Sequence, residues 1–104
     1  MSSSVKVATR DELPPGGKKL VEIDGRAIAV FNVDGRYYAI DDVCTHDGGP
    51  LAEGELVGSE IECPRHGARF DVRSGQPLCM PAIEPVAVHA VELKGDDVYV
   101  ATDD

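Results

Sequence analysis

The feature that most constrains this chain is a pair of short motifs, each of which combines one cysteine with one histidine. The first motif is Cys44-Thr45-His46 and the second is Cys63-Pro64-Arg65-His66, and sixteen residues separate His46 from Cys63. Thiolate and imidazole are ligands that transition metals and iron–sulfur clusters both accept. Glycines at positions 48, 49 and 67 flank the motifs and let the backbone pass close to a buried group. Cys44, His46, Cys63 and His66 are therefore the candidate ligands of a metal centre.

The spacing within each motif bears on which centre it is. Structural zinc sites usually pair ligands with two to four residues between them, which Cys63 and His66 satisfy and Cys44 and His46 do not. Two ligands as close as Cys44 and His46 reach two different atoms more easily than one small tetrahedral ion. In a [2Fe–2S] cluster held by two Cys and two His, both cysteines ligate one iron and both histidines the other. The spacing favours such a cluster, and a zinc ion in the same site is the alternative.

Outside these motifs the sequence predicts short strands joined by turns. Asp24-Gly25 and Asp34-Gly35, a dipeptide that two-residue hairpins prefer, stand between apolar runs. Strand-like segments occupy residues 19–23, 26–33, 36–40, 60–63, 68–72, 86–93 and 98–101. We expect one all-β domain over residues 1–104, with a loop-rich inset at about 42–83.

The N-terminal residues predict little regular structure. Residues 1–4 are polar and are expected to form a frayed tail. Residues 9–13 predict at most one helical turn, with Thr9 as its cap and Pro14 as its stop.

In their longer context, Cys44–Gly49 and Cys63–Asp71, the two motifs resemble the two ligand boxes of Rieske iron–sulfur domains. Pro81-Ala82 resembles the third loop of that family, which covers the cluster. Among Rieske proteins, the chain looks most similar to the free-standing ferredoxins of bacterial ring-hydroxylating oxygenase systems. The resemblance implies the Rieske fold, an antiparallel β-sandwich base with a small cluster-binding subdomain. It also implies one Rieske-type [2Fe–2S] cluster on Cys44, His46, Cys63 and His66.

The same resemblance implies a one-electron carrier rather than an enzyme, with His46 and His66 at an exposed tip. Its partners would be a flavin-dependent ferredoxin reductase and a terminal non-haem iron oxygenase. No candidate nucleophile, acid–base pair or substrate pocket stands out, and 104 residues leave no room for an oxygenase's catalytic domain. Two other functions stay open: a small Rieske-like subunit of an assimilatory nitrite reductase, and a non-redox, metal-stabilised interaction module.

The net charge and the number of cysteines restrict the partners that this chain can bind and the cellular compartment that suits it. The formal net charge of −9 repels nucleic acid and anionic membranes. It suits brief docking on a basic partner, and it also suits plain solubility. Three cysteines cannot all pair as disulfides, which points to a reducing compartment. With no secretory signal and no apolar run long enough for a membrane helix, we expect a cytoplasmic, soluble monomer.

Four positions differ from the membrane-anchored Rieske proteins of respiratory complexes. Gly49 and Arg65 stand where those proteins have disulfide-bonded cysteines, and Ala68 and Phe70 stand where they have a Ser and a Tyr hydroxyl near the cluster. Hydrogen bonds donated to the cluster stabilise its more negative reduced form and raise the potential. The resemblance therefore implies a potential at the lower end of the Rieske range.

Two further residues receive ordinary interpretations. His89 lies outside both boxes in an alternating segment, and we expect a strand histidine without a redox role. Cys79 precedes Pro81 closely, so we expect a small apolar side chain on a loop near the cluster.

Overall fold

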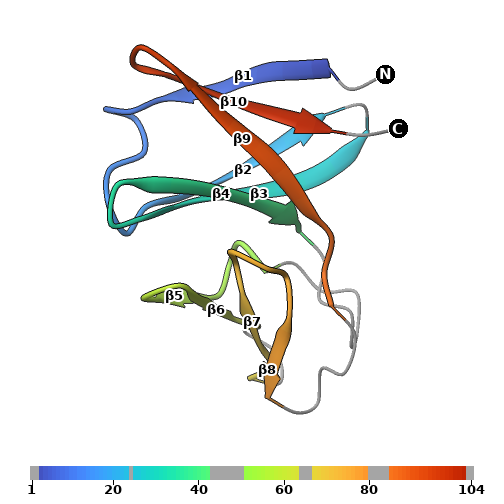
Figure 1. Ribbon diagram of the computed structural model, residues 1–104. Coiled ribbons are helices and arrows are strands. Elements are labelled where there is room, and N and C mark those ends of the chain that lie inside the picture. The colour runs from blue at the N-terminus through green and yellow to red at the C-terminus, as the bar shows by residue number, and fades with distance from the viewer. Residues whose placement is uncertain (1–2, 24, 43–50, 64–66, 80–84, 103–104) are drawn as a thin grey trace.

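The computed structural model describes residues 3–23, 25–42, 51–63, 67–79 and 85–102. Within these residues every regular element is a strand, which confirms the all-β prediction (Figure 1). The strands are β1 (Ser3–Thr9), β2 (Lys18–Ile23), β3 (Arg26–Val33), β4 (Arg36–Asp41), β5 (Glu55–Val57), β6 (Glu60–Glu62), β7 (Arg69–Asp71), β8 (Pro77–Cys79), β9 (Val88–Lys94) and β10 (Asp97–Thr102). They form two antiparallel sheets with strand orders β1-β10-β9-β4-β3-β2 and β5-β6-β7-β8.

Strand β3 buries both of its faces, which explains its continuous apolar run. Successive side chains of a strand point to opposite faces of the sheet. Ile28 and Val30 pack into the core of the larger sheet, whereas Ala29 and Phe31 pack against the smaller sheet. All four are fully buried. β3 is therefore the wall between two separate cores.

The larger sheet curves around its own core, to which both edge strands contribute. The buried members of this core are Val7, Ala8, Leu13, Ile23, Ile28, Val30, Tyr37, Ala39, Val98 and Val100. Lys19 on β2 donates a hydrogen bond of 2.8 Å from Nζ to the carbonyl oxygen of Val7 on β1, so the two edge strands are also linked directly. This is the sandwich-like base that the resemblance implies.

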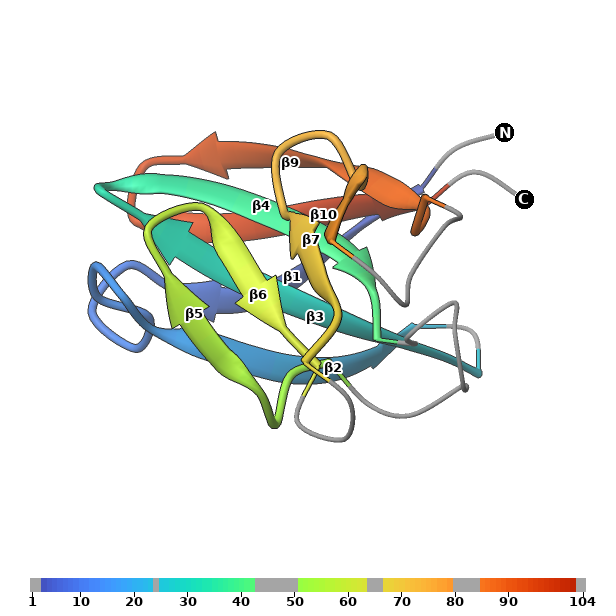
Figure 2. The same ribbon diagram turned by 90° about the horizontal axis from the view of Figure 1, so that it is seen from below.

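The smaller sheet packs on the opposite face of β3 and β4 (Figures 1 and 2). The cluster of buried residues that joins the two sheets consists of Ala29, Phe31, Ile40, Leu51, Ile61, Cys63, Ala68, Phe70, Val72 and Val86. A candidate ligand, Cys63, therefore belongs to the core that fixes the small sheet to the base.

The hairpin turn between β3 and β4 agrees with the sequence prediction. Asp34 has φ +52° and Gly35 has φ +92°. Positive φ at both central residues is the geometry of a type I′ turn, whose twist matches that of the flanking strands. Asp24 of the other Asp-Gly pair lies outside the described residues.

Three strands differ from the sequence-based expectation. β1 begins at Ser3, and Ser3 and Ser4 pair with Thr102 and Ala101, so the prediction of a frayed tail is wrong for these two serines. Main-chain pairing with β10 orders them without any apolar side chain. β5 and β8 span three residues each, too few for an alternating pattern to be recognised. β8 is an edge strand, where Pro77 is tolerated.

Residues 9–13 form the single capped turn that their sequence predicts. Thr9 N donates to Glu12 Oε1 at 2.8 Å, and Glu12 N donates to Thr9 Oγ1 at 3.4 Å. This reciprocal pair is a capping box, and the backbone hydrogen bond from Thr9 lowers the pKa of Glu12. Pro14 follows, and no helix develops here. Among the described residues, no helix has the length and apolar character needed to span a membrane.

Candidate metal centre

Of the four predicted ligands, Cys63 is the one whose position the structure describes. Cys44, His46 and His66 lie outside the described residues, as do Gly49, Arg65, Pro81 and Ala82. Within the described residues, no three His, Cys, Asp or Glu side chains come together in a way that would hold a metal ion. A metal centre with three or more such ligands therefore needs at least one from outside the described residues, where Cys44, His46 and His66 lie. The structure does place the residues at which those segments begin and end.

Cys63 is suited to a buried ligand role. It follows β6 directly, is 1% exposed and forms no disulfide. Cys63 N donates to Ala68 O at 2.6 Å, and Gly67 N donates to Cys63 O at 3.0 Å, so the chain returns on itself across the second box. Gly67 has φ +74°, a conformation that glycine adopts without strain. A buried cysteine without a disulfide is free to coordinate a metal as a thiolate, and the positive charge of the metal offsets the cost of burying that thiolate.

Ala68 and Phe70 lie in the same apolar cluster as Cys63. Both side chains are fully buried, and Phe70 is on β7 opposite Ile61 of β6. Neither side chain has a hydroxyl that could donate a hydrogen bond toward a neighbouring thiolate. Cys63 thus shares its core with hydrocarbon side chains at these two positions.

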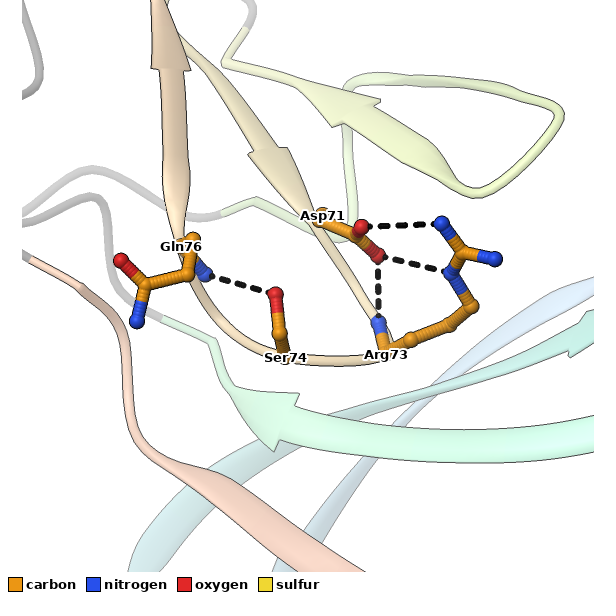
Figure 3. Close-up of polar contacts among 4 residues, drawn as sticks. All are labelled: Asp71, Arg73, Ser74 and Gln76. Carbon is orange, nitrogen blue, oxygen red and sulfur yellow. Dashed lines mark hydrogen bonds and ion pairs between the residues drawn. The ribbon is translucent and has the colours of Figure 1, made fainter.

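An ion pair organises the turn after β7 (Figure 3). Arg73 donates to the Asp71 carboxylate from Nε at 3.2 Å and from its terminal nitrogen at 3.1 Å, and the Arg73 backbone N–H donates to Asp71 Oδ1 at 2.9 Å. The side-chain hydrogen bond lowers the pKa of Asp71 and raises the pKa of Arg73. Ser74 Oγ accepts from Gln76 N at 3.3 Å in the same turn. This turn fixes the exit of the second box.

Asp42 ties together the two ends of the segment that carries the first box. Its Oδ1 accepts hydrogen bonds from the backbone N–H groups of Leu51, at 2.7 Å, and Ala52, at 2.6 Å. Its own N–H donates to Ala27 O on β3 at 3.0 Å. Sequence reasoning missed this residue. The available signal was a carboxylate directly before a glycine-rich loop, a position at which Asp commonly accepts backbone hydrogen bonds.

The neighbouring Asp41 links the same point to β9. His89 Nε2 lies 2.7 Å from Asp41 Oδ1, and the His89 side chain is 6% exposed. Asp41 N also donates to Ala87 O at 2.9 Å. His89 is a strand histidine, as expected, and its buried ring has a carboxylate partner that the sequence analysis did not anticipate.

A family model and curated relatives match this chain over most of its length. The model described as the Rieske [2Fe–2S] domain matches residues 3–99. The biphenyl dioxygenase ferredoxin subunit of Pseudomonas sp. (strain KKS102) is 41% identical over 96 residues, which cover 91% of this chain and 88% of that protein.

Solved structures of related proteins agree with the family match. The ferredoxin of carbazole 1,9a-dioxygenase from Nocardioides aromaticivorans IC177 has a TM-score of 0.93 and 38% identity, covering 97% of this chain and 99% of that one. A ferredoxin in complex with the reduced oxygenase of a carbazole 1,9a-dioxygenase has a TM-score of 0.91 and 40% identity, covering 94% and 92%. A protein described as the small subunit of an NADH-dependent nitrite reductase from Mycobacterium tuberculosis, at 22% identity and a TM-score of 0.88 over 100% and 98%, shares the fold.

The matching model spans nearly the whole chain, and the relatives exceed 30% identity over almost their full lengths. The fold, with a small sheet packed on a sandwich-like base, agrees with this match. The chain therefore belongs to the family of Rieske [2Fe–2S] domains.

Proposed function

We propose that this chain is the ferredoxin component of a ring-hydroxylating dioxygenase system and carries single electrons to a terminal oxygenase. The observation that carries the proposal is the similarity to dioxygenase ferredoxins at about 40% identity, which extends over nearly the full length of both chains. The relatives that match over nearly their full lengths are themselves named as ferredoxin components or subunits of dioxygenase systems. The chain is thus a carrier and not the catalyst.

Its cofactor is one Rieske-type [2Fe–2S] cluster, which supplies reversible one-electron oxidation and reduction when bound. In our proposal Cys44 and Cys63 ligate one iron, and His46 and His66 ligate the other. Support for the second box comes from the buried, disulfide-free Cys63 in the core between the sheets. Support for the first box comes from its sequence and from Asp42, which holds its two ends together.

The partner chemistry follows from charge and from the relatives. A related ferredoxin forms a complex with its oxygenase, and we extend that partnership to this chain. We also propose a flavin-dependent reductase as the electron donor, a monomeric state, and a cytoplasmic location. The net charge of −9 favours brief encounters steered by opposite potentials, in which small interfaces release the partner quickly.

Anaerobic stopped-flow mixing tests this function. The dithionite-reduced protein is mixed with the oxidised terminal oxygenase of the Nocardioides carbazole 1,9a-dioxygenase, and its reoxidation is followed by visible absorbance. We expect fast reoxidation that slows as ionic strength rises, because salt screens the attraction. Buffer without oxygenase is the control. A reduced protein that remains reduced in the presence of the oxygenase would contradict the proposed partner, and a rate independent of salt would contradict electrostatic docking.

A further inference from the structure

Asp42 stands out among the charged residues because a single oxygen of its carboxylate accepts hydrogen bonds from two successive backbone N–H groups beyond the first box. The N–H groups of Leu51 and Ala52 both point at Asp42 Oδ1, at 2.7 and 2.6 Å. Hydrogen bonds to an ionised acceptor are shorter and stronger than those between neutral groups. The two bonds therefore form a strong connection across the intervening residues 43–50.

Each side of this connection is anchored in the base or in the core. On one side, Asp42 N donates to Ala27 O of β3 at 3.0 Å, directly after the end of β4. On the other side, Leu51 is fully buried in the core between the two sheets, and Ala52 packs against that core. The Asp42 carboxylate thus holds Leu51 and Ala52, at the far end of the segment, next to the end of β4.

Residues 43–50 include Cys44 and His46, the first pair of proposed ligands. The second box begins at Cys63 in the same core that contains Leu51. A cluster bound by both boxes requires the first to be held at a fixed distance from the second. Bringing the two ends of a chain segment together costs chain entropy, and a preformed connection removes that cost from cluster binding.

We propose that Asp42 is a positioning residue for the cluster: it presets the ends of the first ligand segment so that Cys44 and His46 meet the second box. This inference rests on the proposed ligand set. Asp42 does not itself contact the cluster in this proposal, and it acts through the two backbone N–H groups.

The variants Asp42→Ala and Asp42→Asn separate this role from general stability. Alanine removes the acceptor, whereas asparagine keeps one oxygen of similar geometry without the charge. Asp96→Ala is the matched control, because it removes a carboxylate from the exposed turn between β9 and β10, at the other end of the base (Figure 1). Each purified, cluster-loaded variant is challenged with an iron chelator, and the loss of visible absorbance gives the rate of cluster release.

We expect Asp42→Ala to release its cluster at least roughly tenfold faster than the wild type, Asp42→Asn to fall between them, and Asp96→Ala to match the wild type. The reduced Asp42→Ala protein should also give a broadened or shifted paramagnetic resonance spectrum, which a change in overall stability alone would not produce. Unchanged release rates and spectra in both Asp42 variants would overturn the inference. It would also be overturned if Asp42→Ala and Asp96→Ala released the cluster equally faster than the wild type and the Asp42→Ala spectrum were unaltered.

Hydrogen exchange in the wild type keeps the inference testable if Asp42→Ala fails to fold. The Leu51 and Ala52 amides should be protected in the cluster-loaded protein, and exchange as fast as in an unstructured chain would contradict the inference. A wild-type protein without a [2Fe–2S] cluster would instead contradict the proposed function. The two failures are therefore distinguishable.

Discussion

His89 Nε2 and Asp41 Oδ1 lie 2.7 Å apart, and this contact joins β9 to the end of β4. The two strands share few paired residues, Ala39 with His89 and Ile40 with Val88, so the side-chain contact reinforces a short junction. With the His89 side chain 6% exposed, loss of the ring would leave Asp41 without this partner and open a cavity.

We therefore predict that His89→Ala lowers the free energy of unfolding by about 1–3 kcal/mol and leaves the visible spectrum of the cluster unchanged. His46→Ala and His66→Ala should instead abolish or greatly diminish that spectrum, because they remove proposed ligands. Urea unfolding and absorbance of the same preparations check both statements. A bleached His89→Ala protein beside a coloured His46→Ala protein would show that the ligand assignment is wrong.

The pair of Asp71 and Arg73 predicts a pH-dependent contribution to stability. The pKa of Asp71 is lowered from its ordinary value of 3.8 in the folded protein, so the unfolded chain binds the proton more tightly. The pair contributes its full stabilisation when the pH is above the ordinary pKa of Asp71. This stabilisation is lost as the pH falls through the lower pKa of the folded state. Because the Arg73 side chain is 57% exposed, water screens the attraction, and we expect only a small contribution of the pair to stability.

Urea unfolding of the wild type and of Asp71→Asn, from neutral pH down to about pH 3, measures this contribution. The difference between the two proteins should be largest at neutral pH and shrink in acid. A difference that grows as the pH falls would contradict the assignment of Arg73 as the cause. Arg73→Gln should show the same trend from the other partner.

Gly75 is predicted to tolerate no side chain. Its φ is +79°, and a Cβ added there would overlap the carbonyl oxygen of Val86, which follows the predicted third loop. Gly75 O also accepts a hydrogen bond from Val86 N at 2.8 Å, so a shift of the backbone would break this link.

We expect Gly75→Ala to destabilise the protein by about 2–4 kcal/mol in thermal or urea unfolding. Gly58→Ala is the control, since Gly58 has φ +62° with nothing within 4 Å of an added Cβ. This variant should lose only the free energy of unfolding that corresponds to the backbone strain, about 1–2 kcal/mol. Equal losses in the two variants would show that the overlap with Val86 is relieved by movement.

The reduction potential should lie at the lower end of the Rieske range, roughly −150 mV. The fully buried Ala68 and Phe70 next to Cys63 offer no hydroxyl donor to the cluster. The double substitution Ala68→Ser with Phe70→Tyr should raise the potential. The rise should be about 40 mV for each kcal/mol by which the new hydrogen bonds stabilise the reduced cluster more than the oxidised one. Phe31→Tyr, a buried phenylalanine of the same core on β3, is the control for an added buried hydroxyl. A wild-type potential above about +100 mV would contradict this account.

The parts of this fold that are predictable from sequence are those with a local cause. The Asp34-Gly35 turn requires positive φ, and the apolar run of β3 reflects burial on both faces. The two ligand boxes are also local patterns, and the family comparison confirms the cofactor that they predict.

The contacts that position the site depend on chain segments that meet only in the folded protein. Asp41 and His89 are 48 residues apart, and they meet because β4 and β9 are neighbours in the sheet. Asp42 accepts hydrogen bonds from Leu51 and Ala52, which follow it in the sequence beyond the whole first box. β1 has no strong apolar pattern at Ser3 and Ser4, and its pairing with β10 is made by the main chain. No local pattern encodes such relationships.

The central claim is that this chain binds one [2Fe–2S] cluster through two cysteines and two histidines and uses it for one-electron transfer. Metal analysis together with paramagnetic resonance of the reduced protein tests it most directly. The account predicts a red-brown protein with about two irons and two sulfides per chain and, on reduction, an axial-to-rhombic signal with a low average g value. A colourless protein that contains zinc and gives no such signal would contradict it and favour a metal-stabilised interaction module.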